Sequence, residues 1–185
     1  MSRALATALV AGFFVVNAVQ ERDFRRRGLD TAGTLPLARP LFLVGKAAMI
    51  LAWLSIVVQS YLLDLRVLDA GPIVTRLAVL VEALGLGLVF LGYRHLGDSN
   101  QMGLGRPPVE LVTRGLYRVT RNPVYLGFFL LTAAAVAYTQ NPLVLALAVV
   151  AVAVHHAIVR AEEAHLEREL GEPYRAYCRR VRRYL

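Results

Sequence analysis

Five apolar stretches, separated by polar segments rich in arginine, make up most of the chain. They cover residues 5–20, 41–63, 73–93, 123–138 and 143–159. A helix that crosses a bilayer needs about 20 apolar residues, each adding about 1.5 Å. The second stretch meets this length easily, whereas the first and the last two are short and imply tilt or local thinning of the bilayer. The pattern therefore predicts an all-α, polytopic membrane protein with about five transmembrane helices.

The last two apolar stretches are joined by residues typical of a turn. No charged residue occurs between Pro123 and Val154, and the apolar run is interrupted at 138–142, where Asn141 precedes Pro142. The Asn-Pro pair favours a turn, and a residue before proline avoids the helical conformation. We expect a tight helical hairpin that crosses the membrane and returns to the same side.

The distribution of arginines predicts the orientation of the chain. Cytoplasmic loops of membrane proteins carry an excess of Lys and Arg. With five crossings and the N-terminus outside, segments 21–40, 94–121 and 160–185 face the cytoplasm and hold most of the arginines. The arginines left outside are Arg3, Arg66 and Arg76. We therefore predict an integral membrane protein with a cytoplasmic C-terminus, located in the inner membrane if the source is prokaryotic.

The polar segment 160–185 has the periodicity of a helix. Its acidic residues come early and its basic residues late, which suits the helix dipole. We expect an amphipathic cytoplasmic helix that lies on the inner leaflet and is broken near Gly171 and Pro173. Its apolar positions are Leu166, Leu170, Tyr174, Tyr177 and Val181.

Composition agrees with a membrane protein and argues against nucleic-acid binding. Hydrophobic residues make up 57% and charged residues 18% of the 185 residues, and a soluble domain of this size cannot bury so much apolar surface. The net charge is +8, but the arginines alternate with apolar segments, where they meet anionic lipid headgroups. The single cysteine, Cys178, excludes a disulfide within this chain.

The strongest local motif is G-L-Y-R-V-T-R-N-P-V-Y-L-G at 115–127. Pro123 suits the first turn of a helix, where its missing N–H costs nothing, and arginines with tyrosines suit the membrane interface. One interpretation is an anchored helix start. The other is a ligand site, in which Asn122 and the preceding backbone present polar groups beside apolar walls.

A second motif, R-A-E-E at 160–163, falls where the last helix leaves the membrane. The hairpin brings both motifs to the same cytoplasmic surface. Ionisable groups at membrane depth are costly and usually functional. An arginine here could hold a substrate carboxylate and a glutamate could hold a ligand ammonium group. The alternative is a solvated helix end with an exposed ion pair.

Together the two motifs resemble a known family. The pattern G-x-Y-x-x-x-R-[HN]-P-x-Y-x-G, an apolar hairpin, and then E-E-x-x-L-x-x-x-x-G-x-x-Y-x-x-Y is similar to the isoprenylcysteine carboxyl methyltransferases and their phospholipid-methylating relatives. These are membrane-embedded, S-adenosylmethionine-dependent methyltransferases without a Rossmann fold. The resemblance implies a single membrane domain over 1–185, with three helices in 1–95 and the cofactor-binding, methyltransferase-like half in 96–185.

The resemblance also implies a set of site residues. Arg160 and Glu163 are the candidate catalytic residues, with Arg160 facing a substrate carboxylate. No metal is expected. Contacts with S-adenosylmethionine are implied for Gln101, Val109, Glu110, Leu111, Val112, Tyr117, Arg121, Asn122, Pro123, Val124, Tyr125 and Glu162.

Two departures from the family pattern bear on these roles. Asn122 stands where many members have histidine, and an asparagine cannot titrate, so proton transfer there is not expected. Arg160 lies slightly closer to the glutamates than the substrate arginine of eukaryotic members, and Gln101 also needs a small shift in the alignment.

The implied reaction transfers a methyl group to a lipophilic acceptor, namely the carboxylate or thiol of an isoprenoid-like or other small hydrophobic molecule. Such a nucleophile arrives ionised, so catalysis requires mainly positioning. The partners expected are this acceptor and membrane lipids, with no nucleic acid.

Three alternatives stay open at this point. One is methylation of a phospholipid headgroup amine. Another is an NADPH-dependent membrane reductase of the sterol-reductase type, which shares an R-[HN]-P block and a Y-C…V stretch matched here by Tyr177, Cys178 and Val181. The last is a non-enzymatic membrane scaffold or lipid-binding protein.

A few polar residues interrupt the apolar stretches. Glu82 is either a functional residue or a carboxylate that snorkels toward Arg76. Lys46, the single lysine, is expected to snorkel to the interface. Of His155 and His156, we expect one to pack and one to face the site.

Overall fold

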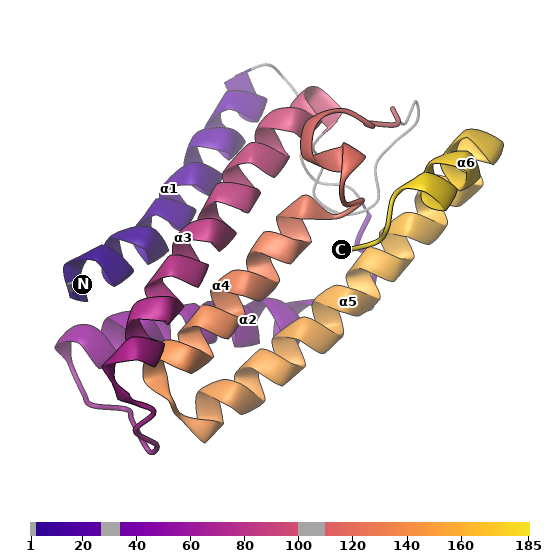
Figure 1. Ribbon diagram of the computed structural model, residues 1–185. Helices are drawn as coiled ribbons and strands as arrows, with labels where there is room; N and C mark the ends of the chain where they lie inside the picture. The colour runs from indigo at the N-terminus through magenta and orange to yellow at the C-terminus, as the bar shows by residue number, and fades with distance from the viewer. Residues whose placement is uncertain (1–2, 27–33, 100–109) are drawn as a thin grey trace.

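The computed structural model describes residues 3–26, 34–99 and 110–185, and within these ranges it is an all-helical bundle (Figure 1). Helix α3 packs along α4, and α2 packs against both α4 and α5. The α-helices are α1 (Arg3–Arg26), α2 (Arg39–Tyr61), α3 (Gly71–Leu96), α4 (Pro123–Thr139), α5 (Pro142–Leu170) and α6 (Glu172–Arg180), with two short 3-10 helices, η1 (Gly97–Ser99) and η2 (Gly115–Arg118).

Four of these helices are long and apolar enough to cross a membrane, namely α1 up to Asp23, α2, α3 and α5. Helix α4 is apolar as well but has 17 residues. At 1.5 Å per residue it reaches roughly 25 Å, a little less than the hydrocarbon thickness of a bilayer. Helix α5 has 29 residues, so it is longer than a crossing requires and carries its last turns beyond the apolar part of the bundle.

Prolines and one asparagine set where the helices begin. Each helix from α2 to α6 has a proline in its first two positions, where the missing N–H breaks no helical hydrogen bond. At the α4–α5 turn Gln140 adopts a left-handed conformation with φ 50°, and the Asn141 side chain accepts from the N–H of Leu143 at 2.8 Å. The predicted hairpin is therefore present.

This turn also fixes the loop between α2 and α3. The carbonyl of Gln140 accepts from the N–H groups of Val67 and Leu68, and its side-chain oxygen accepts from Ala70 N at 2.5 Å. Asn141 Nδ2 donates to the carbonyl of Leu65. We call this end of the bundle the hairpin end and the opposite one, where α4 begins and α5 ends, the site end.

Helices α3 and α4 approach closely through glycines. A Cβ on Gly85 would lie 2.9 Å from the carbonyl oxygen of Gly127, and one on Gly127 would lie 2.7 Å from that of Gly85. Toward the site end, Gly92 leaves room for Val124, whose side chain would be 2.7 Å from an added Cβ. These close contacts fix the start of α4 against α3.

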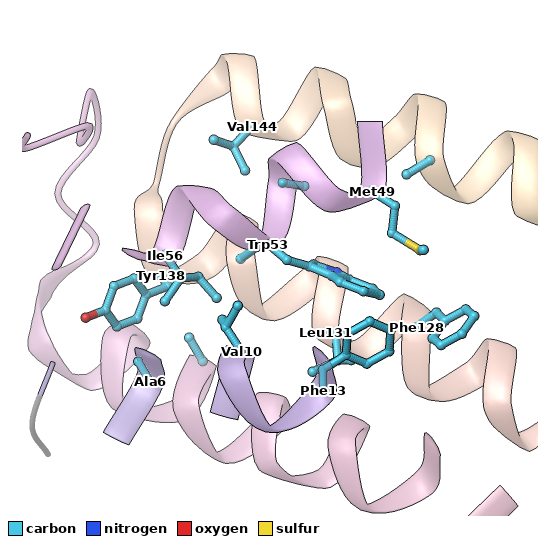
Figure 2. Close-up of a cluster of buried hydrophobic side chains, with 14 of the residues drawn as sticks. Ala6, Val10, Phe13, Met49, Trp53, Ile56, Phe128, Leu131, Tyr138 and Val144 are labelled. Carbon is cyan, nitrogen blue, oxygen red and sulfur yellow. The ribbon is translucent and has the colours of Figure 1, made fainter. Parts of the chain in front are cut away.

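Aromatic side chains fill the core between the helices (Figure 2). Trp53 of α2 donates from Nε1 to Thr132 Oγ1 at 3.0 Å, so its indole is held in place by a buried hydrogen bond. Its ring lies 4.4 Å from that of Phe13 and 5.8 Å from that of Phe128, centroid to centroid. The contact with Phe13 is edge-to-face, an arrangement that stabilises a core beyond the area it buries.

The structure corrects three sequence-based expectations. Helix α5 continues without interruption to Leu170, so no separate helix begins at Arg160, and the chain breaks at Gly171, where φ is 60°. Glu82 does not snorkel toward Arg76, because its side chain faces the core and is 1% exposed while Arg76 is exposed. The Lys46 ammonium turns toward α4, where it lies 5.8 Å from the ring centre of Phe128.

Candidate functional site

The segment before α4 is held against the end of α3 by a histidine. The N–H of Leu116 donates to His95 Nδ1 at 3.2 Å. Gly115 has φ 58°, and a Cβ there would lie 2.4 Å from the His95 ring, so both the backbone conformation and the space require glycine. The result is a fixed turn, η2, that buries Tyr117.

Helix α6 locks this turn from the other side. Tyr177 Oη donates to the backbone carbonyl of Tyr117 at 2.7 Å. Burial raises the pKa of Tyr177 to about 12, which keeps the phenol protonated as a donor. Burial is also the main cause that raises the pKa of Tyr117, and the nearby charge of Glu162 adds to it. Tyr117 therefore lies within electrostatic reach of α5.

Glu163 is the centre of a saturated ion-pair network, which we call the Glu163 clamp. Arg121 donates to both of its carboxylate oxygens, at 3.1 and 3.2 Å, and Asn122 Nδ2 donates to Oε1 at 2.9 Å. Arg183 donates from Nε to Oε2 at 2.9 Å. The side chains of Arg121 and Glu163 are 12% and 10% exposed, so this pair is nearly buried.

The clamp also fastens the C-terminal tail to the beginning of α4. Arg121 N donates to the carbonyl of Arg182 at 2.9 Å, and Thr120 Oγ1 donates to that of Arg183 at 3.1 Å. The next residue, Tyr184, bonds His156 Nδ1 through its hydroxyl at 2.9 Å. The hydrogen bond from Arg183 to Glu163 raises the pKa of the Arg183 guanidinium, as expected for a closely paired cation.

Glu162 lies next to the clamp but has a different environment. Within the part of the chain that the structure describes, its one hydrogen bond comes from Tyr125 Oη, at 2.7 Å to Oε1. The charge of Glu162 also interacts with the ammonium group of Lys46 on α2 and with the hydroxyls of Tyr93 and Tyr117. We call Glu162, Tyr125 and Lys46 the Glu162 cluster. A carboxylate has about four acceptor positions, so Glu162 can bind further donors.

Most of the site residues expected from the sequence converge at this end of the bundle. Tyr117, Arg121, Asn122, Tyr125, Glu162 and Glu163 are linked by the contacts above. Pro123 and Val124 are buried at the start of α4 and pack toward α3. The central expectation, that the two sequence motifs meet, is confirmed.

The residues that precede η2 have less direct roles. Val112 is buried, and Leu111 packs against Tyr174 and Tyr177 beside α6. Glu110 is exposed and accepts from Ser99 Oγ at 3.2 Å. Gln101 and Val109 lie outside the described residues.

Arg160 is separated from the cluster. It is exposed, and because successive helical residues turn by about 100°, it points roughly 200° away from Glu162 around α5. Its role on a substrate carboxylate stays a prediction, and so does the catalytic role of Glu163, whose contacts favour a positioning function.

Two of the three histidines of α5, His155 and His156, have different environments, and the prediction that one of them packs is confirmed by His155. His155 is 1% exposed and bonds the carbonyl of Ala151 through Nδ1 at 2.7 Å, and no described residue bonds its Nε2. His156 faces the C-terminal tail through Tyr184. Within the described residues no three His, Cys, Asp or Glu side chains are grouped as metal ligands.

Sequence reasoning missed three residues that contribute here. Arg183 and Tyr184 follow the end of the recognised pattern, and their contacts depend on the return of the tail to α4. Lys46 lies far upstream in a part of the chain without any motif. Its status as the single lysine, within an apolar helix, was the one available signal.

The fold and this site define a class of protein: a helical membrane protein whose polar residues converge from α4, α5 and the C-terminal tail at one end of the bundle. The family model of the phospholipid methyltransferases matches residues 73–173, more than half of the chain. The chain therefore belongs to this family of membrane methyltransferases, which also includes the isoprenylcysteine carboxyl methyltransferases. The resemblance found in the sequence is thus confirmed. No curated protein matches the chain.

The family and the apolar helices together make this protein an integral membrane methyltransferase.

Proposed function

We propose that the protein transfers a methyl group from S-adenosylmethionine to a lipophilic acceptor at the cytoplasmic face of the membrane. One observation carries the proposal. Two adjacent carboxylates of α5 differ in how many hydrogen bonds they accept: among the described residues, Glu163 accepts from three side chains and Glu162 from one, Tyr125. A carboxylate with spare acceptor capacity, next to aromatic side chains, is suited to a ligand ammonium group.

The residues present fit S-adenosylmethionine. Glu162 would hold the ammonium of its amino-acid part, and the rings of Tyr125 and Tyr117 would attract its positive charge, as aromatic faces attract cations. The remaining cofactor contacts that we propose are those of the family pattern: Gln101, Val109, Glu110, Leu111, Val112, Arg121, Asn122, Pro123 and Val124.

When bound, S-adenosylmethionine would supply an electrophilic methyl group, because its neutral thioether is a good leaving group for in-line attack by an ionised nucleophile. The Glu163 clamp positions the residues proposed to contact the cofactor, because Glu163 fixes Arg121 and Asn122 at the start of α4. Asn122 uses its amide N–H groups in the clamp and cannot titrate, so no proton transfer is assigned to it. The C-terminal tail, which is bonded to the start of α4, would exclude water from the reacting atoms.

The proposed topology has five crossings, with α4 as the short one. The N-terminus and the hairpin end lie outside, and the site end, α6 and the C-terminus lie in the cytoplasm, with α6 along the inner leaflet. Arginine placement supports this orientation: Arg22, Arg25 and Arg26 end α1, whereas Arg3, Arg66 and Arg76 are the arginines assigned to the outside.

The acceptor that we favour is the carboxylate or thiol of an isoprenoid-like or other small hydrophobic molecule, because such a group arrives already ionised. A second candidate is a phospholipid headgroup amine. The name of the matching family supports it, and so does the buried, unpartnered Nε2 of His155, since an amine must lose a proton before it can attack.

Calorimetric titration of the detergent-purified protein with S-adenosylhomocysteine and with NADPH tests the proposed function. We expect binding of the first ligand and none of the second. Binding of NADPH alone would favour a reductase, and binding of neither would favour a scaffold. Transfer of labelled methyl from S-adenosylmethionine to a lipid extract would then identify the acceptor fraction.

A further inference from the structure

A lysine and a glutamate border the same pair of aromatic rings on α4. The Lys46 ammonium lies 5.8 Å from the ring centre of Phe128, and Glu162 accepts from the hydroxyl of Tyr125 at 2.7 Å. The Phe128 and Tyr125 rings are themselves in edge contact, with their centroids 5.7 Å apart. Lys46 of α2 and Glu162 of α5 therefore meet one aromatic surface of α4 from two different helices.

Close packing of α2 on α5 holds the lysine in this position. The preceding residue is Gly45, and a Cβ added there would lie 2.3 Å from the Val154 side chain, so the two helices touch without an intervening side chain. The Lys46 ammonium also lies 5.5 Å from the ring centre of Phe42, one turn earlier on α2. Attraction to the two rings keeps the half-buried side chain inside the bundle.

The charges of Lys46 and Glu162 act on each other without touching. Among the described residues, Lys46 is the cation whose charge acts on Glu162. No ion pair joins the two within 4.0 Å, and neither of them forms an ion pair with another described residue. Opposite charges attract strongly where the dielectric is low, so the packing of the three helices imposes the separation. The space between them has a cation on one side and an anion on the other.

A zwitterion matches this pair of charges, and this step rests on the proposed function. The amino-acid part of S-adenosylmethionine carries an ammonium and a carboxylate on the same carbon. Once Glu162 holds the ammonium, the carboxylate must therefore lie close by. A charge that leaves water without gaining a partner is costly. Glu162 by itself would compensate the ammonium and leave the carboxylate of the ligand uncompensated.

The arginines at the site end are less suited to this carboxylate than Lys46. Arg121 and Arg183 are bound to Glu163, so moving either of them onto a ligand would break the Glu163 clamp. Arg160 is exposed and points roughly 200° away from Glu162 around α5. Lys46 has no ion pair with a described residue to break, and its charge already acts on Glu162.

We propose that Lys46 binds the carboxylate of the cofactor's amino-acid part, so that Lys46 and Glu162 together recognise the zwitterion. Lys46 donates to the carboxylate while Glu162 accepts from the ammonium, and each ligand charge exchanges water for a group of opposite sign. Lys46 is then a binding residue that α2 contributes from outside both sequence motifs. The pair selects ligands with an intact α-amino acid group.

Calorimetric titration with S-adenosylhomocysteine and two trimmed ligands tests the proposal. Decarboxylated S-adenosylhomocysteine lacks the carboxylate, and the deaminated compound lacks the ammonium. The wild-type protein should bind the intact ligand at least about tenfold more tightly than either, because each trimmed ligand loses a charge-assisted hydrogen bond. Lys46→Met should bind the intact and decarboxylated ligands within about twofold of each other and still discriminate against the deaminated one. Glu162→Gln should show the opposite pattern.

Two further variants separate the charge of Lys46 from its location. Lys46→Arg keeps the charge and should keep most of the preference for the carboxylate. Arg39→Met removes an exposed cation from the start of the same helix and should bind all three ligands as the wild-type protein does. A wild-type preference for the carboxylate in Lys46→Met would overturn the assignment. Loss of that preference in Arg160→Met, with Lys46→Met unaffected, would give the carboxylate to Arg160.

An effect confined to the methyl acceptor would also overturn the assignment. If Lys46→Met binds S-adenosylhomocysteine normally but raises KM for the acceptor in a labelled-methyl assay with a lipid extract, Lys46 faces the acceptor and not the cofactor. Failure of the wild-type protein to bind S-adenosylhomocysteine at all would instead refute the proposed function itself, and this inference with it.

One comparison needs only the wild-type protein, in case Lys46→Met does not fold. The decarboxylated ligand should bind at least about tenfold more weakly than S-adenosylhomocysteine. Equal affinity for the two would show that no cation of the protein holds the carboxylate, and would contradict the proposal while leaving the proposed function in place.

Discussion

The Glu163 clamp and the Glu162 cluster lie side by side on α5 and serve opposite purposes. In the clamp, Glu163 accepts from Arg121, Asn122 and Arg183, and these contacts join the start of α4 to the tail. In the cluster, Glu162 has one hydrogen bond and Lys46 has none among the described residues. A buried charge network is rigid when all its hydrogen bonds are made. A ligand site instead requires polar groups that still have hydrogen-bonding capacity for the ligand.

The comparison shows how one step along a helix can separate stability from binding. Adjacent helical residues point about 100° apart, so Glu163 faces the tail and α4 while Glu162 faces α2 and Tyr125. The two regions share a helix and a charge type. Substitutions of the two carboxylates should therefore affect different measurements.

The largest effect is expected for Glu163→Gln. The substitution leaves Arg121 without its buried counter-ion, and breaking such a pair costs about 3 kcal/mol or more. The melting temperature in detergent should fall by about 10 °C. Glu169→Gln, on the exposed surface of α5, is the control and should melt like the wild-type protein. Equal melting of Glu163→Gln and the control would show that the clamp is not structural.

Glu162→Gln should reverse this pattern. It removes the proposed partner of the cofactor ammonium, so S-adenosylhomocysteine should bind about 10- to 100-fold more weakly by calorimetry, the equivalent of one or two charge-assisted contacts. The melting temperature without ligand should stay close to that of the wild-type protein. An unchanged affinity would remove Glu162 from the site.

Tyr177→Phe tests whether the hydrogen bond that holds the η2 turn also stabilises the Glu162 cluster. The variant loses the 2.7 Å hydrogen bond from the Tyr177 hydroxyl to the Tyr117 carbonyl and leaves that carbonyl unpaired. We expect a loss of about 1–2 kcal/mol in the free energy of unfolding, measured as a small drop in melting temperature, with a modest loss of S-adenosylhomocysteine affinity. No change in either quantity would argue against a supporting role for α6.

The smallest effect on melting temperature is expected for a third buried carboxylate, Glu82. Glu82 is 1% exposed, and neither of its oxygens has a hydrogen-bond partner among residues 3–26, 34–99 and 110–185. It lines a void of about 10 Å³ beside Trp53 and Leu131, room for one water at most. Glu82→Met keeps the volume and removes an unpaired polar group, so the melting temperature should stay equal or rise slightly while S-adenosylhomocysteine affinity is unchanged. A marked loss of affinity would make Glu82 a functional residue.

Much of the fold could be predicted from the sequence because lipid and helix geometry leave few choices. The five apolar stretches match α1 to α5, and the Asn141-Pro142 pair places the hairpin correctly. The end of α5 was not predictable, since the apolar run stops at Val159 while the helix continues to Leu170. Hydropathy marks where a helix leaves an apolar medium, whereas helix length depends on local propensity and capping.

The candidate site was predictable where its residues lie in motifs. Asn122, Tyr125, Glu162 and Glu163 were found because each motif is continuous in the sequence and the hairpin brings the two together. Arg183 and Lys46 could not be found in this way, because their positions depend on how the tail returns and how α2 packs on α5. The resemblance already gave Glu162 to the cofactor and Glu163 to catalysis, and the hydrogen bonds of Glu163 favour a positioning function in place of the catalytic one.

The most direct test of the central claim is the position of the ligand amino group in an experimental structure of the protein with S-adenosylhomocysteine. We predict that this nitrogen lies within hydrogen-bond distance of the Glu162 carboxylate, with Glu163 still paired to Arg121. An amino group bound at Glu163, or bound away from α5 altogether, would contradict the account.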